Sequence, residues 1–454
     1  MDDRDDDTSS EHRERADTDD RDTGGGDGDD KDGGSRKSGA DHADTRTVAL
    51  GGASAAPGEV ARGWFSVAEL PTGAPERLPV VIVNGADPGP TLWLTGGVHG
   101  DEATGVAVVQ DAVETLAGVR SDLAGTVVAV PVVSPAGLRR NARHTYYADE
   151  DPNRHFPDAD AESARPPKLQ ERIDARLYAA ITGETVEETG RTVEGVDETE
   201  EDVAGEDNGD HAPVNPPIAE PAGTGVVADA LIDCHTAGVG SEPFAIRDRV
   251  LYGERRSEDE AVSLSDELGR LVAAFGFPAV REYPAAEYVE ENLQRSTAGA
   301  VLNEAGIPAF TAELGAHSVV DDRLVEAGVA GIVGAAVELG VVPAAAVPES
   351  VGEPGDSLDP APVEFPVRRF RGPTADVSGL LRHRVAAGES FAEGDLLADV
   401  VSATGAHRDS ISADRDGYVL GRSEGLATYE GDPIASLAVR DDGDLVVPRE
   451  DGDA

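Results

Sequence analysis

Three short segments carry residue types that can hold a metal ion and transfer a proton. In the first, GGVHGDE, His99 stands at a glycine-flanked turn after an apolar run, and Glu102 follows three residues later. This spacing lets one imidazole and one carboxylate converge on a single metal from the end of a strand and the start of a helix. Alone the pattern is weak, because a capping glutamate beside an incidental surface histidine has the same spacing.

The second segment, LIDCHT, places His235 at the end of another apolar run. The carboxyl edge of an α/β sheet is where functional sites gather. Side chains alternate along a strand, so we expect Asp233 and His235 to share a face and Cys234 to point into the core. Two histidines and one carboxylate, with a fourth position left to water, make up a hydrolytic zinc site. The alternative is a core histidine satisfied by its neighbours.

The third segment, IPAFTAELG, brings Glu313 to the end of an apolar strand. A carboxylate in such a strand is costly to bury unless it is paired or functional. Beside a metal-bound water it could take the proton of the attacking water and pass it to a leaving amine. The alternative is an ion pair with an arginine of the same domain.

The elements that position these residues follow from hydrophobic periodicity. Apolar runs rich in Val and Ile predict buried strands at 78–85, 91–98, 126–133, 226–235 and 307–314. Helical spacing of apolar residues follows the second strand, where Asp101 is the predicted N-cap. Further helices are predicted at 166–181, 257–274 and 319–339. We therefore expect an α/β domain over 47–342 with helices flanking a mixed sheet, because the region before residue 90 has the pattern of antiparallel strands.

One acidic segment precedes this domain and a second is inserted within it. Residues 1–46 contain no Val, Ile, Leu, Phe, Trp or Tyr, and residues 183–225 hold thirteen acidic residues and one basic residue. Such segments cannot bury enough apolar surface to offset the entropy lost on ordering. We expect a disordered tail and a disordered insertion.

After a proline-rich linker at 343–362, residues 363–445 have the pattern of short strands and turns. This region contains a repeat: AEGDLLADV (392–400) and YEGDPIASL (429–437) each place Glu-Gly-Asp in a turn before an alternating strand. Paired half-motifs of this kind resemble the barrel-sandwich hybrid domains of lipoyl and biotinyl carriers, although the lysine of a carrier is missing. We expect a small all-β domain of that type.

Composition excludes several functions. The chain has 454 residues, with 89 acidic and 38 basic side chains and a formal net charge of −51, which argues against a nucleic-acid partner. Neither an apolar stretch of about 18 residues nor a signal-like N-terminus occurs, so we expect no membrane association and a cytoplasmic location. The single cysteine, Cys234, allows no disulfide within the chain.

The type of basic residue is informative as well, because only three are lysine and 35 are arginine. This bias, together with the acid excess, is typical of haloarchaeal proteins. Removing the two acidic segments still leaves a charge of −30, which favours a halophile over a mesophilic protein with acidic tails.

Four motifs in sequence order give the chain a family resemblance. HGDE (99–102), DPNRHFP (151–157), DCHT (233–236) and AELG (312–315) resemble the succinylglutamate desuccinylase and aspartoacylase family of zinc carboxypeptidase-like hydrolases. The resemblance covers about residues 47–440, and a trailing β-domain also occurs in that family. It implies a zinc-carboxypeptidase-like mixed sheet and one Zn²⁺ per chain.

The resemblance also implies roles for individual residues. His99, Glu102 and His235 match the zinc ligands, and Glu313 matches the catalytic glutamate. Further matches are Asn153 and Arg154, which would hold a substrate carboxylate, and Arg143, which would polarise the scissile carbonyl and has Arg140 as its rival. Two departures put the loop shape in doubt, Pro152 where Leu is usual and Asp158 where Gly is usual.

We expect a zinc-dependent amidohydrolase that removes an acyl group from an N-acyl amino acid or a related small amine carrying a carboxylate. Two alternatives stay open: a metallocarboxypeptidase acting on short peptides, and a non-catalytic binding module stabilised by the metal. The acyl group, the amine and the oligomeric state, including a possible homo-oligomer, are left open.

The charge predicts that folding depends on salt. Dense carboxylates repel one another at low ionic strength and are screened within about 3 Å near 1 M salt. We expect the melting temperature of the full chain, measured by calorimetry, to rise between about 0.1 M and 2 M salt. Equal melting temperatures at the two concentrations would contradict the halophile interpretation.

Overall fold

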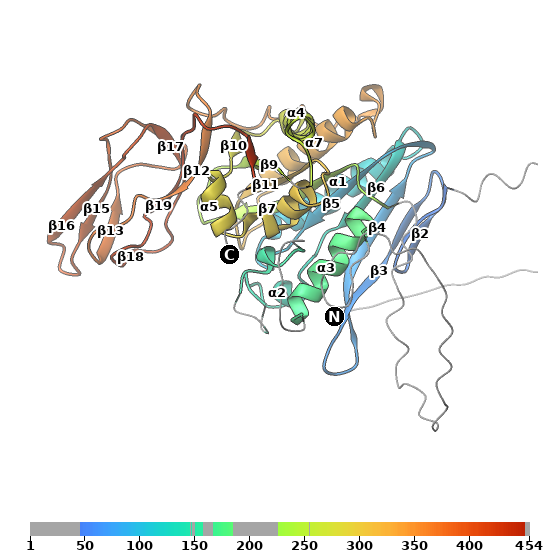
Figure 1. Cartoon of the computed structure of the whole chain (residues 1–454), viewed down its shortest axis with the longest axis horizontal. Coiled ribbons are helices and arrows are strands. Elements are labelled where there is room, and N and C mark those ends of the chain that lie inside the picture. The colour runs from blue at the N-terminus through green and yellow to red at the C-terminus, as the bar shows by residue number, and fades with distance from the viewer. Residues whose placement is uncertain are drawn as a thin grey trace, which may run out of the picture. The chain divides into compact units, whose positions relative to one another are not determined.

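One mixed sheet runs through most of the chain (Figure 1). The computed structural model describes residues 46–145, 147, 150–157, 167–184, 226–253 and 255–449. The first eight strands of this sheet, in chain order, are β3 (Val60–Glu69), β4 (Pro75–Asn84), β5 (Asp87–Gly96), β6 (Ala124–Val130), β7 (Ala230–Ala237), β8 (Phe244–Arg247), β10 (Ala279–Arg281) and β11 (Ala309–Ala316). A separate hairpin is formed by β1 (Val48–Leu50) and β2 (Ala53–Ala55).

The five strands predicted from apolar runs correspond to β4, β5, β6, β7 and β11, each within four residues of its expected ends. Strand β5 is parallel to β6 and β7, and β7 is parallel to β11, whereas β4 is antiparallel to both β3 and β6. The expected mixed sheet is therefore confirmed, including its antiparallel beginning.

Helices pack in two groups. One group comprises α1 (Ala103–Gly118), α4 (Glu258–Phe275) and α7 (Asp322–Leu339), and the other pairs α3 (Leu169–Thr182) with α6 (Thr297–Asn303). The predicted helices correspond to α1, α3, α4 and α7, and α4 begins where the Ser257 hydroxyl accepts a hydrogen bond from the backbone N–H of Glu260. Two further helices, α2 (Pro135–Leu138) and α5 (Ala285–Glu290), and also α6, are too short for periodicity to reveal.

The N-cap predicted for α1 is wrong. The N-cap residue is Glu102, not Asp101, and its side chain makes no capping hydrogen bond. The Glu102 carboxylate instead contacts His99 and His235, and the Asp101 carboxylate lies 3.7 Å from His317. Contacts among the candidate metal ligands thus replace the cap that the sequence pattern suggests.

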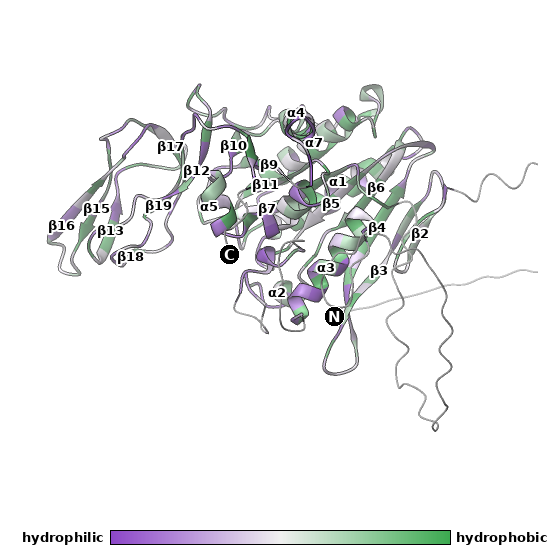
Figure 2. Cartoon of the chain, in the orientation of Figure 1, coloured by the Kyte–Doolittle hydropathy of each residue, from purple (hydrophilic) through white to green (hydrophobic). Residues whose placement is uncertain are grey.

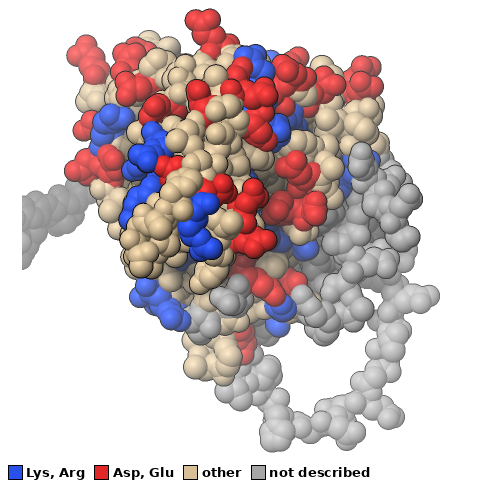
Figure 3. Space-filling model, turned by 90° about the vertical axis from the view of Figure 1, so that its left-hand side faces the viewer, with Lys and Arg blue, Asp and Glu red and all other residues tan. Residues whose placement is uncertain are grey.

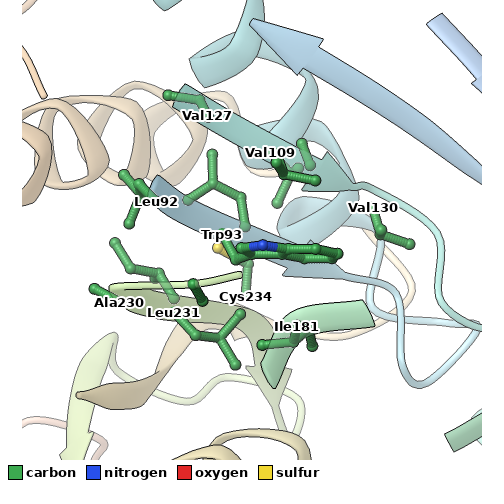
Figure 4. Packing of buried hydrophobic residues seen from close by; sticks show 14 of the residues in the cluster. Leu92, Trp93, Val109, Val127, Val130, Ile181, Ala230, Leu231 and Cys234 are labelled. Atoms are coloured by element: carbon green, nitrogen blue, oxygen red, sulfur yellow. The ribbon is translucent and has the colours of Figure 1, made fainter. Parts of the chain in front are cut away.

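The core lies on both sides of the central strands. Figure 4 shows Trp93 of β5 surrounded by apolar side chains, with Cys234 of β7 in the same cluster. Both residues are fully buried, and burial raises the pKa of the Cys234 thiol. Cys234 is therefore a packing residue, as predicted, and hydrophobic residues follow the strands and helices of this region (Figure 2).

The C-terminal strands form two sheets around a second core of apolar side chains. Four of them extend the central sheet, namely β12 (Val367–Arg371), β14 (Ser390–Phe391), β17 (Gly417–Arg422) and β19 (Ala435–Arg440). The others form a sheet of their own, namely β13 (Gly379–His383), β15 (Leu396–Val401), β16 (His407–Ser412) and β18 (Ala427–Thr428). The complete order of the large sheet is β14-β17-β19-β12-β10-β8-β11-β7-β5-β6-β4-β3.

A small antiparallel β-domain is thus present, but its sheet joins the central sheet through a pairing that the sequence analysis did not foresee. Strand β12 pairs with β10, with Arg368 beside Arg281. The predicted limits of the domains and of the linker remain a prediction.

The sequence repeat corresponds to two equivalent turns. Gly394 and Gly431 both have φ of +91°, a conformation that favours glycine. The carboxylates of Asp395 and Asp432 accept hydrogen bonds from the backbone N–H of Ala392 (2.9 Å) and of Tyr429 (2.8 Å). The two half-motifs therefore enter β15 and β19 by the same local geometry, while the predicted acidic segments lie, apart from Arg46, Gly183 and Glu184, outside the described residues.

The surface carries many acidic side chains, with basic side chains among them on the face seen in Figure 3. Nothing in the fold supports a haloarchaeal origin, and the salt dependence stays a prediction. No helix within the described ranges is long and apolar enough to cross a membrane.

Arg249 forms hydrogen bonds between the C-terminal residues and the central domain. Strand β20 (Val446–Pro448) pairs in parallel with β9 (Val250–Tyr252). The buried Arg249 guanidinium donates to the Asp441 carboxylate (3.0 Å) and to three backbone carbonyls, those of Tyr283 (3.1 Å), Glu282 (3.2 Å) and Asp444 (2.7 Å). Three backbone carbonyls thus depend on this side chain, and the Asp441 oxygen that it contacts also accepts from Arg281 (3.1 Å).

We expect Arg249→Met to lower the free energy of unfolding by about 3–5 kcal/mol, because it leaves three backbone carbonyls without their donor and removes one of the two arginines that pair with Asp441. The control is Arg270→Met, which removes an exposed ion pair with Glu338 and should cost less than about 1 kcal/mol. Denaturant unfolding in high salt measures both variants, and equal losses would contradict the anchoring role.

Candidate active site

One cleft of about 890 Å³ is lined by the candidate metal ligands, the candidate catalytic residues and the candidate carboxylate-binding pair. The lining includes His99, Glu102, Arg143, Asn153, Arg154, His235 and Glu313. Arg140 is exposed and does not line the cleft, so of the two candidate upstream arginines only Arg143 lies at this site. Residues of the C-terminal strands, such as Arg369 and Arg422, line the cleft as well.

Three buried side chains meet at the floor of the cleft. His99 follows β5, Glu102 immediately precedes α1, and His235 belongs to β7. The Nδ1 atom of His99 lies 2.6 Å from one Glu102 oxygen, and the Nδ1 atom of His235 lies 2.8 Å from the other. One potential ligand atom from each residue lies within 4.8 Å of the other two.

The far nitrogen of each imidazole is held by a second carboxylate. The Nε2 atom of His99 lies 2.9 Å from an Asp151 oxygen, and the Nε2 atom of His235 lies 2.7 Å from an Asp233 oxygen. Asp233 also accepts a hydrogen bond from the Thr95 hydroxyl (2.7 Å). With a metal ion bound, such pairing would keep the proton on Nε2 and leave Nδ1 free to coordinate.

This arrangement fits a divalent metal ion. Two Nδ1 atoms and one carboxylate converge on one point, as the ligands of a single metal ion do. The buried Glu102 Oε2 atom has the Nδ1 atom of His235 as its polar neighbour (2.8 Å), which is consistent with a ligand role. The donor set of two imidazoles and one carboxylate is that of zinc in hydrolytic sites.

Electrostatics keep the cluster charged. Burial alone would raise the pKa of Glu102, but His99 and His235 hold it well below its usual range. Burial alone would lower the pKa of His235, but Asp233 and Glu102 raise it well above the usual value. The Glu102 carboxylate is therefore ionised near neutral pH.

Asp151 joins three parts of the site, although the sequence analysis gave it no role. One of its oxygens contacts His99 and accepts the backbone N–H of Asn153 (2.9 Å), and the other accepts from Arg143 (3.1 Å). Arg143 also donates to Glu102 (3.2 Å). In the sequence, the one signal that could have pointed to Asp151 is its position directly before the Pro-Asn-Arg motif.

The loop with Asn153 and Arg154 forms the short 3-10 turn η2 (Pro152–Arg154). Pro152 fits the first position of this turn, because its fixed φ and missing N–H are tolerated there. The Asn153 side-chain oxygen accepts from the backbone N–H (2.8 Å) and the hydroxyl (3.0 Å) of Thr297, which fixes the loop to α6. Asp158, the second position at which the loop differs from the usual family motif, lies outside the described residues.

Arg154 extends from this loop into the cleft. Its guanidinium donates to the backbone carbonyl of Asn153 (2.7 Å) and makes no ion pair with any described residue. Burial lowers the pKa of Arg154, with the nearby Asp151 carboxylate opposing the shift. A guanidinium in this setting can receive an anionic group from the cleft.

Glu313 lies beside His235, because β7 and β11 pair in parallel with these two residues in register. Its Oε2 atom is buried without a hydrogen bond. The ion pair with an arginine considered above does not form among the described residues. Burial raises the pKa of Glu313, His235 opposes the shift, and Glu102 adds to it.

Sequence comparison adds a family match. Residues 88–187 match the profile of the succinylglutamate desuccinylase/aspartoacylase catalytic domain. The chain belongs to the succinylglutamate desuccinylase/aspartoacylase family. The matched segment contains His99, Glu102, Arg143, Asn153 and Arg154, whereas His235 and Glu313 lie beyond it. No curated protein sequence matches this family member.

Solved structures share the fold of this family member over most of its length. A succinylglutamate desuccinylase from a Silicibacter species superposes with a TM-score of 0.58 at 19% identity, covering 87% of this chain and 98% of the other. An aspartoacylase family protein from Mesorhizobium loti gives 0.56 at 16% identity, covering 85% and 96%. The product-bound ectoine utilization protein EutE (DoeB) from Ruegeria pomeroyi gives 0.57 at 18% identity, covering 86% and 98%.

The geometry predicts which residues this family member needs to hold metal. We expect the purified protein to bind about one zinc ion per chain, and His99→Ala or His235→Ala to lose it, because two remaining protein ligands cannot compete with hydration. Metal analysis after dialysis measures the occupancy. His144→Ala, which changes a histidine outside the cluster, is the matched control, and full zinc occupancy in both cluster variants would rule out the site.

Proposed function

We propose that this family member is a zinc-dependent amidohydrolase that removes the acyl group from an N-acyl amino acid or a related small N-acyl amine. The observation that carries the proposal is the convergence of the His99–Glu102–His235 cluster with Glu313 and Arg143 in one cleft. Within the described ranges, no fourth His, Cys, Asp or Glu joins the cluster. An incomplete protein shell favours a catalytic site over a structural one.

His99, Glu102 and His235 would hold the zinc ion, one per chain. When bound, zinc supplies a Lewis acid that polarises a carbonyl and lowers the pKa of a water molecule. Asp151 and Asp233 keep the two imidazoles in the tautomer that ligation needs. The remaining chemistry falls to side chains of the chain itself.

Glu313 is suited to move the proton. Its raised pKa and unpartnered oxygen allow it to accept a proton from the attacking water and to deliver it to the departing nitrogen. Its register beside His235 keeps this carboxylate next to the metal ligands. A neutral amide at this position could not accept the proton.

Arg143 is suited to stabilise the oxygen of the reacting carbonyl. Its contacts with Glu102 and Asp151 hold the guanidinium beside the candidate ligands. Burial by itself would lower the pKa of Arg143, but the Glu102 and Asp151 carboxylates raise it. The arginine thus remains a fixed positive charge where negative charge develops.

Arg154 and Asn153 would hold the carboxylate of the substrate. The planar guanidinium fork matches a carboxylate with two hydrogen bonds, and Arg154 has no competing ion pair within the described part of the chain. The Asn153 side chain, bound to Thr297, keeps the loop in place. The substrate we propose is therefore a small N-acyl compound with a free carboxylate.

Glu313→Gln tests the proposed chemistry. We expect the variant to keep its zinc and to lose about two to four orders of magnitude in kcat, because proton transfer is removed without loss of a ligand. The assay follows release of free amine from N-acetyl and N-succinyl amino acids in molar salt, with dipeptides in parallel.

The matched control is Glu326→Gln, which changes an exposed glutamate of α7 and should behave as the wild type. A Glu313→Gln rate within threefold of the wild type would make Glu313 structural. Cleavage of dipeptides without cleavage of N-acyl amino acids would replace the deacylase by a carboxypeptidase.

A further inference from the structure

Asp248 is a buried carboxylate in the cleft that the proposed reaction does not use. It lies between β8 and β9, its residue is 4% exposed, and it lines the same cleft as the His99–Glu102–His235 cluster. Across the described residues, its side chain forms no hydrogen bond and no ion pair. Burying a carboxylate without a partner costs free energy. A ligand group that enters the cleft and pairs with Asp248 would recover a large part of that cost as binding free energy.

The neighbouring charged residues are already engaged. Glu282 accepts from the Arg369 guanidinium (2.8 Å) with one oxygen and from the backbone N–H of Tyr283 (3.0 Å) with the other. Arg249, next to Asp248 in sequence, donates to Asp441 and to backbone carbonyls. Of this group, Asp248 alone faces the cleft with both oxygens unpaired.

The local charges are arranged for a ligand with charges of both signs. Burial raises the pKa of Asp248 well above its usual value, Glu282 adds to the shift, and Arg369 and Arg154 oppose it. Glu282 and Arg369 neutralise one another as an ion pair. Once Arg154 binds the substrate carboxylate, its charge is compensated as well, and Asp248 is left without a positively charged partner.

We propose that Asp248 accepts a protonated amine of the substrate, so that the substrate is an N-acylated diamino acid. This inference rests on the proposed deacylase function and narrows its substrate class. Such a compound carries a carboxylate for Arg154, a scissile amide for the metal cluster and a second, free amine for Asp248. An ammonium group that reaches Asp248 forms a charge-assisted hydrogen bond and restores the balance of charge.

Two isomers share this chemistry. The acyl group sits on the α-amine, which leaves a free side-chain amine, or it sits on the side-chain amine, which leaves the α-amine free. Each isomer has an analogue that differs by the loss of the free amine. Nα-acetyl-lysine pairs with Nα-acetyl-norleucine, and Nε-acetyl-lysine pairs with 6-acetamidohexanoate, and ornithine gives the corresponding shorter pairs.

The test compares kcat/KM within each pair on the zinc-loaded full-length protein. We expect the amine-bearing member of at least one pair to be preferred by about tenfold or more. Asp248→Asn should reduce that ratio to within about threefold of one. Asp111→Asn, the same change at an exposed position of α1, should keep both the activity and the ratio of the wild type.

Two kinetic results would overturn the proposal while leaving the deacylase function intact. One is a wild type that hydrolyses the amine-free analogues as well as their partners. The other is an Asp248→Asn variant that keeps the preference, since Asp248 would then act as a neutral carboxyl group. The pair that shows the preference identifies the acylated amine.

If no N-acyl compound is hydrolysed, a binding measurement can still test the amine site separately from the proposed deacylase function. Titration calorimetry with free lysine and ornithine then tests the subsite alone. Binding to the wild type that weakens about tenfold in Asp248→Asn supports the amine site without deacylase activity. Absence of binding to the wild type would overturn the amine site together with the function.

Discussion

Three buried groups that converge on one point dominate this structure. The Glu102 carboxylate lies between the Nδ1 atoms of His99 and His235, whose Nε2 atoms contact Asp151 and Asp233 on the far side of each ring. A metal ion at this point would be held by all three groups. The strand ends, the start of α1 and the loop at Asp151 are therefore all constrained by one small volume.

The parallel strands bring the candidate metal ligands and the candidate catalytic residues together. The pairing of β5, β7 and β11 brings His99, His235 and Glu313 to one edge of the sheet, although they are far apart in sequence. Asp151 then connects the metal cluster to Arg143 and to the turn that presents Arg154. Displacement of one of these groups would disturb hydrogen bonds of the others, so the site behaves as one unit.

The sequence predicted the parts of the site that follow long apolar runs, because His99, His235 and Glu313 each end or follow a strand whose pattern is unambiguous. It could not predict the N-cap of α1, since the ligand role of Glu102 competes with capping. Asp248, Glu282 and Arg369 were missed because they come from short strands and from the β-domain. Only tertiary pairing, such as that of β10 with β12, brings them into the cleft.

That same pairing builds the cleft from two parts of the chain. The chain before β12 supplies the reacting groups, whereas β12 and β17 supply Arg369, Arg371 and Arg422 to the lining. Insertions and substitutions in the C-terminal strands can change this part of the cleft lining without moving a candidate metal ligand. Within the family, selectivity can therefore diverge by drift in a region that bears none of the chemistry.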